Sequence, residues 1–194
     1  MKTVVLFLVA TLMAGGAMAS GNLKVNFASN DADVTVVEIT NAKLSDYEIE
    51  ISDEYGYELY SMETIAPIGT LSKKYDFSGL DNGIYWYKVK TDKETKTSRI
   101  QVDNGTVEVL DIRKSVEPVF KMEDNKLKFS FLNFPEEDVK LYVYDANNKV
   151  LAEEKLGNGF AINKAIDLSE LVYGDYEVVI ANDADIFSYQ VSVK

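Results

Sequence analysis

Residues 166–193 read IDLSELVYGDYEVVIANDADIFSYQVSV, and residues 75–102 read YDFSGLDNGIYWYKVKTDKETKTSRIQV. The two stretches align without a gap at an offset of 91 residues (167 minus 76). The identical pairs are Asp76 and Asp167, Ser78 and Ser169, Leu80 and Leu171, Gly83 and Gly174, Tyr85 and Tyr176, and Val102 and Val193. A repeat of this length predicts that one structural unit occurs twice along the chain.

Short runs of alternating apolar and polar residues surround both stretches. NLKVNF at 22–27 and YEIEISD at 47–53 each place their apolar residues on one face of an extended chain. Turn signals such as LDNG, VDNG and DANN separate the runs. We expect strands near 22–28, 33–40, 46–52, 57–63, 72–77, 83–91 and 96–102 in the first copy, and near 117–122, 126–132, 138–145, 149–155, 163–168, 174–181 and 186–193 in the second. About seven strands per copy predict an all-β fold of two tandem immunoglobulin-like antiparallel β-sandwiches.

The first residues have the pattern of a secretory signal peptide. Lys2 gives a positive start, residues 4–14 are almost wholly apolar, and Ala17-Met18-Ala19 is a small-residue cleavage pattern. The apolar run is too short for a permanent membrane-spanning helix. We therefore expect a cleaved signal peptide at 1–19, a first domain at 20–104, an inter-domain strand or linker at 105–114 and a second domain at 115–194.

The composition narrows the classes of function. The formal net charge is −12, so phosphate backbones and anionic headgroups are repelled. We expect no nucleic-acid binding and no direct membrane insertion after signal cleavage. The chain has no cysteine, so burial alone must hold an exported fold together. It also has no histidine, which removes Ser-His and Cys-His nucleophiles. We expect no enzymatic activity and a secreted, periplasmic or cell-surface location.

The repeated motif Leu-x-x-Gly-x-Tyr marks a corner between two strands. A tyrosine at such a corner, with its hydroxyl bonded to nearby backbone, recurs in immunoglobulin-like sandwiches. The glycine lets the backbone pass closely or adopt a conformation that is costly for other residues. The corner residues are Leu80, Gly83 and Tyr85 in the first copy and Leu171, Gly174 and Tyr176 in the second. We interpret them as structural and not catalytic.

The second copy also carries an aspartate hairpin followed by a lysine, and a final strand with a basic end. The residues of this pattern are Asp145, Lys149, Val150, Leu171, Gly174, Tyr176 and Lys194. With them, residues 117–194 resemble the C-terminal sorting domain family of the bacterial type IX secretion system, and residues 22–102 resemble it more faintly. Asn148 replaces the glycine of the family, and Asp175 replaces a small apolar residue. The resemblance implies an immunoglobulin-like sandwich and contact with a secretion machinery.

Trp86 is the candidate for a partner-binding surface. If Tyr85 and Tyr87 point inward, strand alternation sends Trp86 to the opposite face. The second copy has Glu177 at the equivalent position. Exposed aromatic residues stack on sugars or anchor protein partners. We expect Trp86, Tyr55, Tyr57 and Tyr60 to form this surface; the alternative is that Trp86 packs under residues 105–112 or between the domains.

The acidic residues do not define a site. Asn-Asp-Ala-Asp occurs at 30–33 and 182–185, but each motif supplies too few oxygens for calcium, and Asx turns explain both. No carboxylate pair has the defined spacing of a catalytic dyad, although a carboxylate-only hydrolase stays open as an alternative. We expect no catalytic residues, no metal and no cofactor.

Two functions fit these observations best. The first is an exported, non-enzymatic binding, adhesion or structural protein of the cell envelope, with a protein or glycan partner. The alternative is type IX targeting, with residues 115–194 as the sorting module and the first domain as its cargo.

Overall fold

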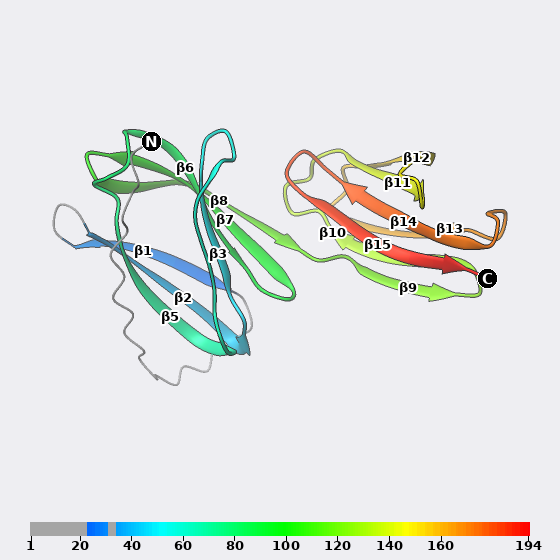
Figure 1. Ribbon diagram of the computed structural model, residues 1–194, viewed down its shortest axis with the longest axis horizontal. Coiled ribbons are helices and arrows are strands. Elements are labelled where there is room, and N and C mark those ends of the chain that lie inside the picture. Colours follow the sequence, from blue (N-terminus) through cyan, green and yellow to red (C-terminus); the bar gives the residue numbers. More distant parts are fainter. Residues whose placement is uncertain (1–22, 31–33) are drawn as a thin grey trace. The chain divides into compact units, whose positions relative to one another are not determined.

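The computed structural model describes residues 23–30 and 34–194 (Figure 1). The predicted signal peptide, residues 1–19, lies outside the described residues. No helix among the described residues has the length and apolar character needed to cross a membrane. The chain divides into two compact units, with the boundary between Lys114 and Ser115.

Eight strands form two sheets in the described part of the first unit. They are β1 (Lys24–Asn30), β2 (Val34–Ser45), β3 (Glu48–Asp53), β4 (Glu58–Glu63), β5 (Ile68–Asp76), β6 (Gly83–Lys90), β7 (Glu94–Asp103) and β8 (Thr106–Val116). One sheet has the order β1-β2-β5 and the other the order β4-β3-β6-β7-β8.

The second unit repeats this topology with seven strands. They are β9 (Val119–Glu123), β10 (Lys126–Leu132), β11 (Val139–Asp145), β12 (Val150–Gly157), β13 (Ala161–Asp167), β14 (Gly174–Ala181) and β15 (Ile186–Val193). The sheets have the orders β13-β10-β9 and β12-β11-β14-β15. In both units the first, second and fifth strands form one sheet and the fourth, third, sixth and seventh the other, which is the arrangement of an immunoglobulin-like sandwich.

The core of the first unit lies between its two sheets. Val37 and Ile39 of β2 share one buried cluster with Ile49 and Ile51 of β3. The alternating burial along β3 and β6 is the period-two pattern of a sheet with one inward face. Burial of each such side chain stabilises the fold by roughly 1.5–3 kcal/mol relative to exposure.

The core of the second unit is built in the same way. Leu127 and Phe129 of β10 share a buried cluster with Leu141 of β11 and Val178 of β14. Figure 1 shows β14 and β15 side by side, and their register pairs Gly174 with Val193. The all-β, antiparallel fold class is therefore confirmed.

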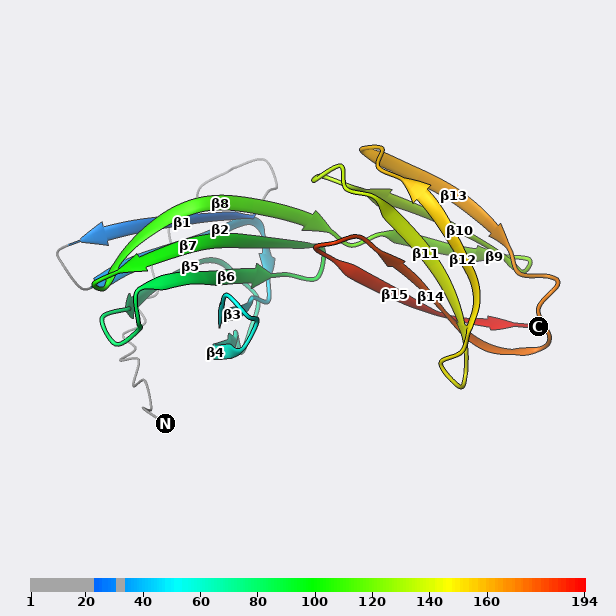
Figure 2. The same cartoon turned by 90° about the horizontal axis from the view of Figure 1, so that it is seen from above.

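The segment predicted as an inter-domain strand or linker is part of β8, the edge strand of the five-stranded sheet. Asn104 and Gly105 have φ of 48° and 80° and connect β7 to β8 in a tight turn; residues that adopt positive φ are typical of such two-residue hairpins. Val107 and Val109 pack against the core of the first unit. Figure 2 shows β8 running alongside β7.

Candidate partner-binding surface

The outer face of the five-stranded sheet presents Trp86. Along β6, Tyr85, Tyr87 and Val89 are buried, whereas Trp86 and Lys88 are only partly buried. Side chains alternate between the two faces of a strand. The indole of Trp86 therefore lies on the face that points away from the core, as predicted from the alternation.

Two residues of neighbouring strands lie directly beside Trp86. The register pairs Trp86 with Ser52 of β3 and with Arg99 of β7. Directly opposed residues in a sheet have their Cβ atoms about 4.5–5.5 Å apart. Ser52 is only 6% exposed although it belongs to the outer face, so large neighbours shield this short side chain. Arg99 is exposed and brings a cation to the rim of the aromatic patch.

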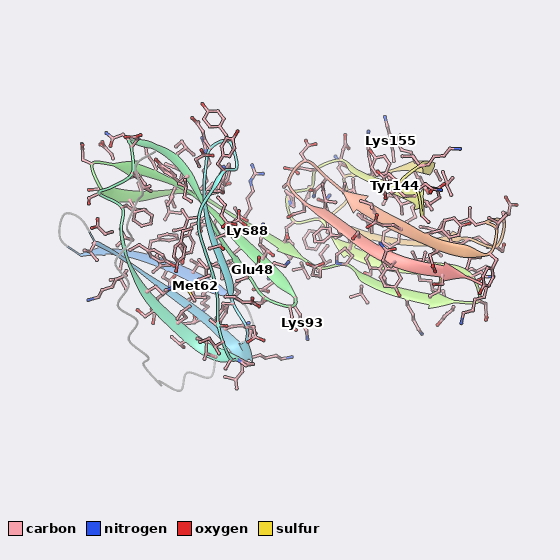
Figure 3. The ribbon with its side chains drawn as sticks, in the orientation of Figure 1. Glu48, Met62, Lys88, Lys93, Tyr144 and Lys155 are labelled. Atoms are coloured by element: carbon pink, nitrogen blue, oxygen red, sulfur yellow. The ribbon has the colours of Figure 1, made fainter. Side chains whose placement is uncertain are left out.

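Paired charges continue this face toward the other end of β6. Lys88 Nζ lies 3.6 Å from a carboxylate oxygen of Glu50, and Lys90 Nζ lies 3.8 Å from one of Glu48. These pairs are the cross-strand neighbours of the β3–β6 register; Glu48 and Lys88 are labelled in Figure 3. The face therefore combines an indole with a ladder of opposite charges, which together present apolar, hydrogen-bonding and ionic groups to a partner.

The hairpin between β3 and β4 carries two exposed tyrosines. Tyr55 is 79% exposed and Tyr57 is 72% exposed. The carboxylate of Asp53 accepts hydrogen bonds from the backbone N–H groups of Tyr55 and Tyr57, both at 2.9 Å. Because Ser52 of β3 pairs with Trp86, the hairpin begins one residue beyond the position opposite the indole. Trp86, Tyr55 and Tyr57 thus belong to one end of the sheet.

Tyr60 does not belong to this surface, and its assignment there was wrong. Tyr60 pairs with Ile51, a buried core residue, and packs against the core. A register shift between Ile51 and Ser52 separates Tyr60 from the hairpin tip. The Tyr60 hydroxyl accepts a hydrogen bond of 2.7 Å from Lys73 Nζ inside the unit.

Lys73 is a feature that the sequence analysis missed. It is 1% exposed, and its ammonium group contacts Tyr60 and the sulfur of Met62. The ammonium nitrogen also lies 5.3 Å from the ring centroid of Tyr60 and 6.0 Å from that of Tyr75. Burial lowers the pKa of Lys73 below its ordinary value, because desolvation disfavours the charged form.

The first unit also buries several tyrosines. The hydroxyl groups of Tyr75 and Tyr87 lie 3.0 Å apart and form a hydrogen bond, and their rings meet edge to face. Burial raises the pKa of Tyr75 and Tyr87 well above the ordinary value. Burial also raises the pKa of Tyr47 to about 12, and its hydroxyl donates to the carbonyl of Gly69 at 3.3 Å. These phenols are held as neutral groups and are structural.

The second unit has an exposed lysine at the position equivalent to Lys73. Lys164, at the offset of 91 from Lys73, is exposed and lies 3.0 Å from a carboxylate oxygen of Glu154. Glu154 in β12 stands where Met62 stands in β4. The repeat was the signal that could have identified Lys73. It aligns Lys73 with Lys164, and the first unit has Met62 where the second has the carboxylate of Glu154.

The two corner tyrosines have the same geometry. The hydroxyl of Tyr85 donates to the carbonyl of Asp81 at 2.8 Å, and that of Tyr176 donates to the carbonyl of Val172 at 2.7 Å. Both rings are buried. In each unit the hydroxyl donates to a backbone carbonyl four residues upstream. Burial, with a smaller contribution from Asp81, Asp53 and Glu54, raises the pKa of Tyr85.

The leucines and glycines of the corners have simple roles. Leu80 and Leu171 pack against their respective cores, and the N–H of each closes a turn at 3.0 Å to a carbonyl three residues upstream. Gly83 and Gly174 do not have positive φ. A Cβ at either glycine would lie 3.8–3.9 Å from the ring of its corner tyrosine. The close approach predicted at these glycines is therefore an ordinary contact with a tyrosine ring.

An aspartate hairpin also occurs in both units. The carboxylate of Asp145 accepts hydrogen bonds from the N–H groups of Asn147 at 2.8 Å and Lys149 at 2.9 Å. Asp53 makes the same pair of bonds in the first unit. The left-handed residue of the hairpin is Gly56 in the first unit, with φ of 85°, and Asn148 in the second, with φ of 58°. The sequence pattern predicted this hairpin only in the second copy.

The acidic motif at residues 182–185 is a turn. The side-chain oxygen of Asn182 accepts hydrogen bonds from the N–H groups of Ala184 at 3.0 Å and Asp185 at 2.7 Å. In the earlier motif, residues 31–33 lie outside the described residues. Within residues 23–30 and 34–194, no group of three or more acidic side chains is arranged to hold a metal ion.

Comparison with known families gives one match. Residues 19–103 match the sequence model of the secretion system C-terminal sorting domain. The resemblance to type IX sorting domains is thus confirmed over the first copy. The stronger resemblance expected for residues 117–194 stays a prediction.

The two copies differ at two positions of the family pattern. Its hairpin has glycine at position 56 where the second copy has Asn148, and its corner has Ile84 where the second copy has Asp175. Asn148 and Asp175 are the two departures from the family pattern noted in the second copy. The first copy has the family's glycine at position 56 and an apolar residue, although a large one, at position 84.

No curated protein matches the chain. Solved structures with similar backbones include the BSP domain of a biofilm-associated protein, at 13% identity and a TM-score of 0.29, covering 88% of this chain and 29% of that one. Another is native alpha-2-macroglobulin from Escherichia coli, at 10% identity and a TM-score of 0.28; the match covers 89% of this chain and 64% of that one. A third is a segment of two fibronectin type-III domains from chicken tenascin, at 11% identity and a TM-score of 0.27; the match covers 90% of this chain and 99% of that one. This chain spans less than two thirds of the first two structures.

The matched segment is less than half of the chain. A sorting domain of this kind indicates a secreted or cell-surface protein that is handled by a secretion machinery.

Proposed function

We propose that this protein is a non-enzymatic binding or structural protein of the cell envelope. Its working surface is the outer face of the five-stranded sheet, where Trp86 contacts a protein or glycan partner. The observation that carries the proposal is the position of the chain's single tryptophan on a face directed away from the core. The second unit has Glu177 at this position, so the conserved framework of the two units does not itself require an indole.

The neighbours of Trp86 support this function. Tyr55 and Tyr57 extend the aromatic area at the hairpin tip. Aromatic side chains bury a large area at a small cost in conformational entropy and are enriched among the residues that dominate binding energy. The paired charges of Lys88 and Glu50 surround the patch with polar groups, as the rim of an interface does.

A retention experiment tests this proposal. The full chain is immobilised and exposed to envelope extract and to isolated envelope polysaccharide. Trp86→Ala is expected to weaken retention of the partner by about tenfold or more, which is typical of an aromatic anchor. Tyr144→Ala is the matched control, because Tyr144 is a partly buried aromatic residue on the outer face of β11 in the second unit (Figure 3).

The outcome is decided by the two variants together. Loss of retention with Trp86→Ala and normal retention with Tyr144→Ala support the proposed surface. Equal retention by both variants, with unchanged circular dichroism, contradicts it. Absence of any retained component with the unmodified chain also contradicts it.

A second candidate function is type IX targeting. We proposed residues 115–194 as the sorting module from their basic end and repeated corner, whereas the family match falls on residues 19–103. Each segment is therefore fused separately to a reporter in a type IX-competent host. Export of the 115–194 fusion supports the second unit as the module, and export of the 19–103 fusion alone assigns it to the first. A reporter that stays in the periplasm with both fusions excludes targeting.

A further inference from the structure

The edge strands of the sheets differ in charge. The four sheets end in eight edge strands, which are β1, β5, β9, β13, β12, β15, β4 and β8. Natural proteins protect such edges with charged residues, because an unprotected edge pairs readily with another chain. Among these eight strands of the described residues, seven contain at least one charged residue within their bounds. The exception is β15.

The sequence of β15 is suited to pairing. It reads IFSYQVSV and contains no charge, no proline and no glycine. Its β-branched and aromatic residues favour extended structure. The inward-facing side chains Phe187, Val191 and Val193 are buried, while Ser188 and Gln190 on the other face are exposed and neutral. Segments with high β-propensity, no net charge and no proline have the composition of strands that pair between chains.

The first unit shows what occupies the equivalent edge. β7 is the counterpart of β15 in the repeat, and β8 pairs with its second edge. Val107 and Val109 of β8 pack against the core of that unit. In the second unit, among the described residues, no strand pairs with β15 on the side away from β14. The same sandwich thus accepts a further strand at this edge in one unit and presents a neutral edge in the other.

The edge of β15 is held in an extended conformation. Tyr189 stacks on Phe120 of β9 with ring centroids 4.8 Å apart. The side chain of Asn125 donates to the carbonyl of Lys194 at 3.1 Å, just beyond the end of the strand. Strand addition to a preformed edge requires little rearrangement, so less of the interaction free energy is lost in ordering the strand.

We propose that two copies of this chain pair antiparallel through β15, joining their four-stranded sheets into one continuous sheet. A second copy of β15 is the favoured occupant because it opposes neutral residues with neutral residues, whereas every other edge strand brings charges. With the two-fold axis perpendicular to the sheet, opposed residues lie on the same face only when the axis passes between the two copies of one residue. We place the axis between the two copies of Gln190, the central residue of 187–193.

This register makes specific pairs. Gln190 opposes Gln190 of the second copy, and Ser188 opposes Ser192, so the residues that meet across the pairing on the exposed face are polar and uncharged. On the inner face, Phe187 opposes Val193 and Tyr189 opposes Val191. Aromatic residues opposed to β-branched residues are among the favourable cross-strand pairs of antiparallel sheets.

Disulfide trapping tests the register. The chain has no cysteine, so any disulfide in a single-cysteine variant joins two copies. Gln190→Cys is expected to form a covalent dimer under mild oxidation, since directly opposed residues meet the Cα separation of a disulfide. Gln101→Cys is the matched control: Gln101 is also an exposed glutamine, but it lies on β7, which has strands on both sides. This control is expected to stay monomeric.

Analytical ultracentrifugation of the full chain tests the pairing without a covalent bond. Gln190→Lys places two like charges directly opposite each other and is expected to raise the dimer Kd at least about tenfold. Gln101→Lys is expected to leave the dimer Kd unchanged. Because Gln190 is exposed, its substitution leaves the core of the unit intact, and circular dichroism confirms this.

Each other outcome overturns the proposal. An unmodified chain that stays monomeric at its highest soluble concentration contradicts pairing between copies. A dimer that persists in Gln190→Lys, or a Gln190→Cys variant that does not form the disulfide, places any self-association elsewhere. A monomer that loses an envelope protein only in Gln190→Lys assigns the edge to a strand of a different protein.

Discussion

The two units share a backbone framework and differ in the side chains they place on it. Both have the aspartate hairpin, with hydrogen bonds from two backbone N–H groups to one carboxylate. Both have the tyrosine corner, with hydroxyl-to-carbonyl distances of 2.8 and 2.7 Å. They differ at the outer face, where Trp86 is replaced by Glu177. They also differ at Lys73, which contacts Tyr60 and Met62, whereas its counterpart Lys164 contacts the carboxylate of Glu154.

This comparison distinguishes residues that maintain the fold from residues that are free to acquire a specific role. Residues that satisfy backbone groups at turns are retained between the units, because a buried or turn backbone group without a partner costs free energy wherever it occurs. Residues on outer faces and edges are not restricted in this way. Differences between the units at such positions, such as Trp86 and the uncharged β15, are therefore where a specific role is most readily found.

The largest expected effect concerns Lys73. Lys73→Met removes a buried ammonium group and keeps most of its volume, so it is expected to raise the free energy of unfolding of the first unit by about 1–4 kcal/mol. Lys164→Met removes an exposed ion pair and is expected to change stability by less than about 0.5 kcal/mol. Urea unfolding followed by circular dichroism measures both. Equal effects of the two substitutions would contradict the contrast between the units.

The corner tyrosines are expected to respond alike. Tyr85→Phe and Tyr176→Phe each remove one hydrogen bond and leave a carbonyl without that donor, so each is expected to destabilise its own unit by about 1–3 kcal/mol. The same unfolding measurement applies. If one substitution is neutral and the other costly, the two corners are not equivalent.

Alkaline pH is expected to destabilise the first unit. Its buried tyrosines have raised pKa values, about 12 for Tyr47 and above the ordinary value for Tyr75 and Tyr87. In the unfolded chain these phenols ionise near pH 10, so the native state binds more protons above that pH. Stability is fully present below about pH 10 and is lost as pH rises through the folded values.

Lys73 contributes with the opposite sign over the pH range below its unfolded pKa. Its folded pKa is lowered, so the unfolded state binds more protons and stability rises with pH until the unfolded lysine also titrates. Unfolding free energies measured in steps from pH 7 to pH 12, for the unmodified chain and for Lys73→Met, separate the two contributions. An unmodified chain whose stability does not fall above about pH 10 would show that these tyrosines are not buried as neutral groups.

The smallest expected effect concerns the hairpins. Gly56 and Asn148 occupy equivalent positions with positive φ. Gly56→Ala is expected to destabilise the first unit by roughly 1 kcal/mol, because a Cβ is unfavourable at positive φ. Asn148→Gly is expected to change stability by only a few tenths of a kcal/mol, because asparagine tolerates this conformation. A larger effect at Asn148 than at Gly56 would indicate that the hairpins differ.

Sequence patterns predicted the strands because period-two burial is a local property. Leu23, Val25 and Ile49 all lie where alternation placed them. The orientation of Tyr60 was not predictable in this way, because the register shift between Ile51 and Ser52 changes the pairing before the hairpin tip. Burial of Lys73 depends on contacts with Tyr60 and Met62 across the two sheets, which no pattern within one strand reports.

The candidate surface was predicted in part for a similar reason. Alternation correctly directed Trp86 away from the core, but its neighbours Ser52 and Arg99 depend on the order of strands in the sheet. The uncharged edge became apparent only when the sheet order identified β15 as an edge strand.

The central claim is that the face around Trp86 binds a partner at the cell envelope. Because the chain contains one tryptophan, incorporation of 5-fluorotryptophan gives a single fluorine resonance that reports this face alone. We expect the resonance to shift or broaden when unlabelled envelope extract is added, and to recover when the partner is removed. A resonance that stays unchanged while the chain is retained by the extract would contradict the claim.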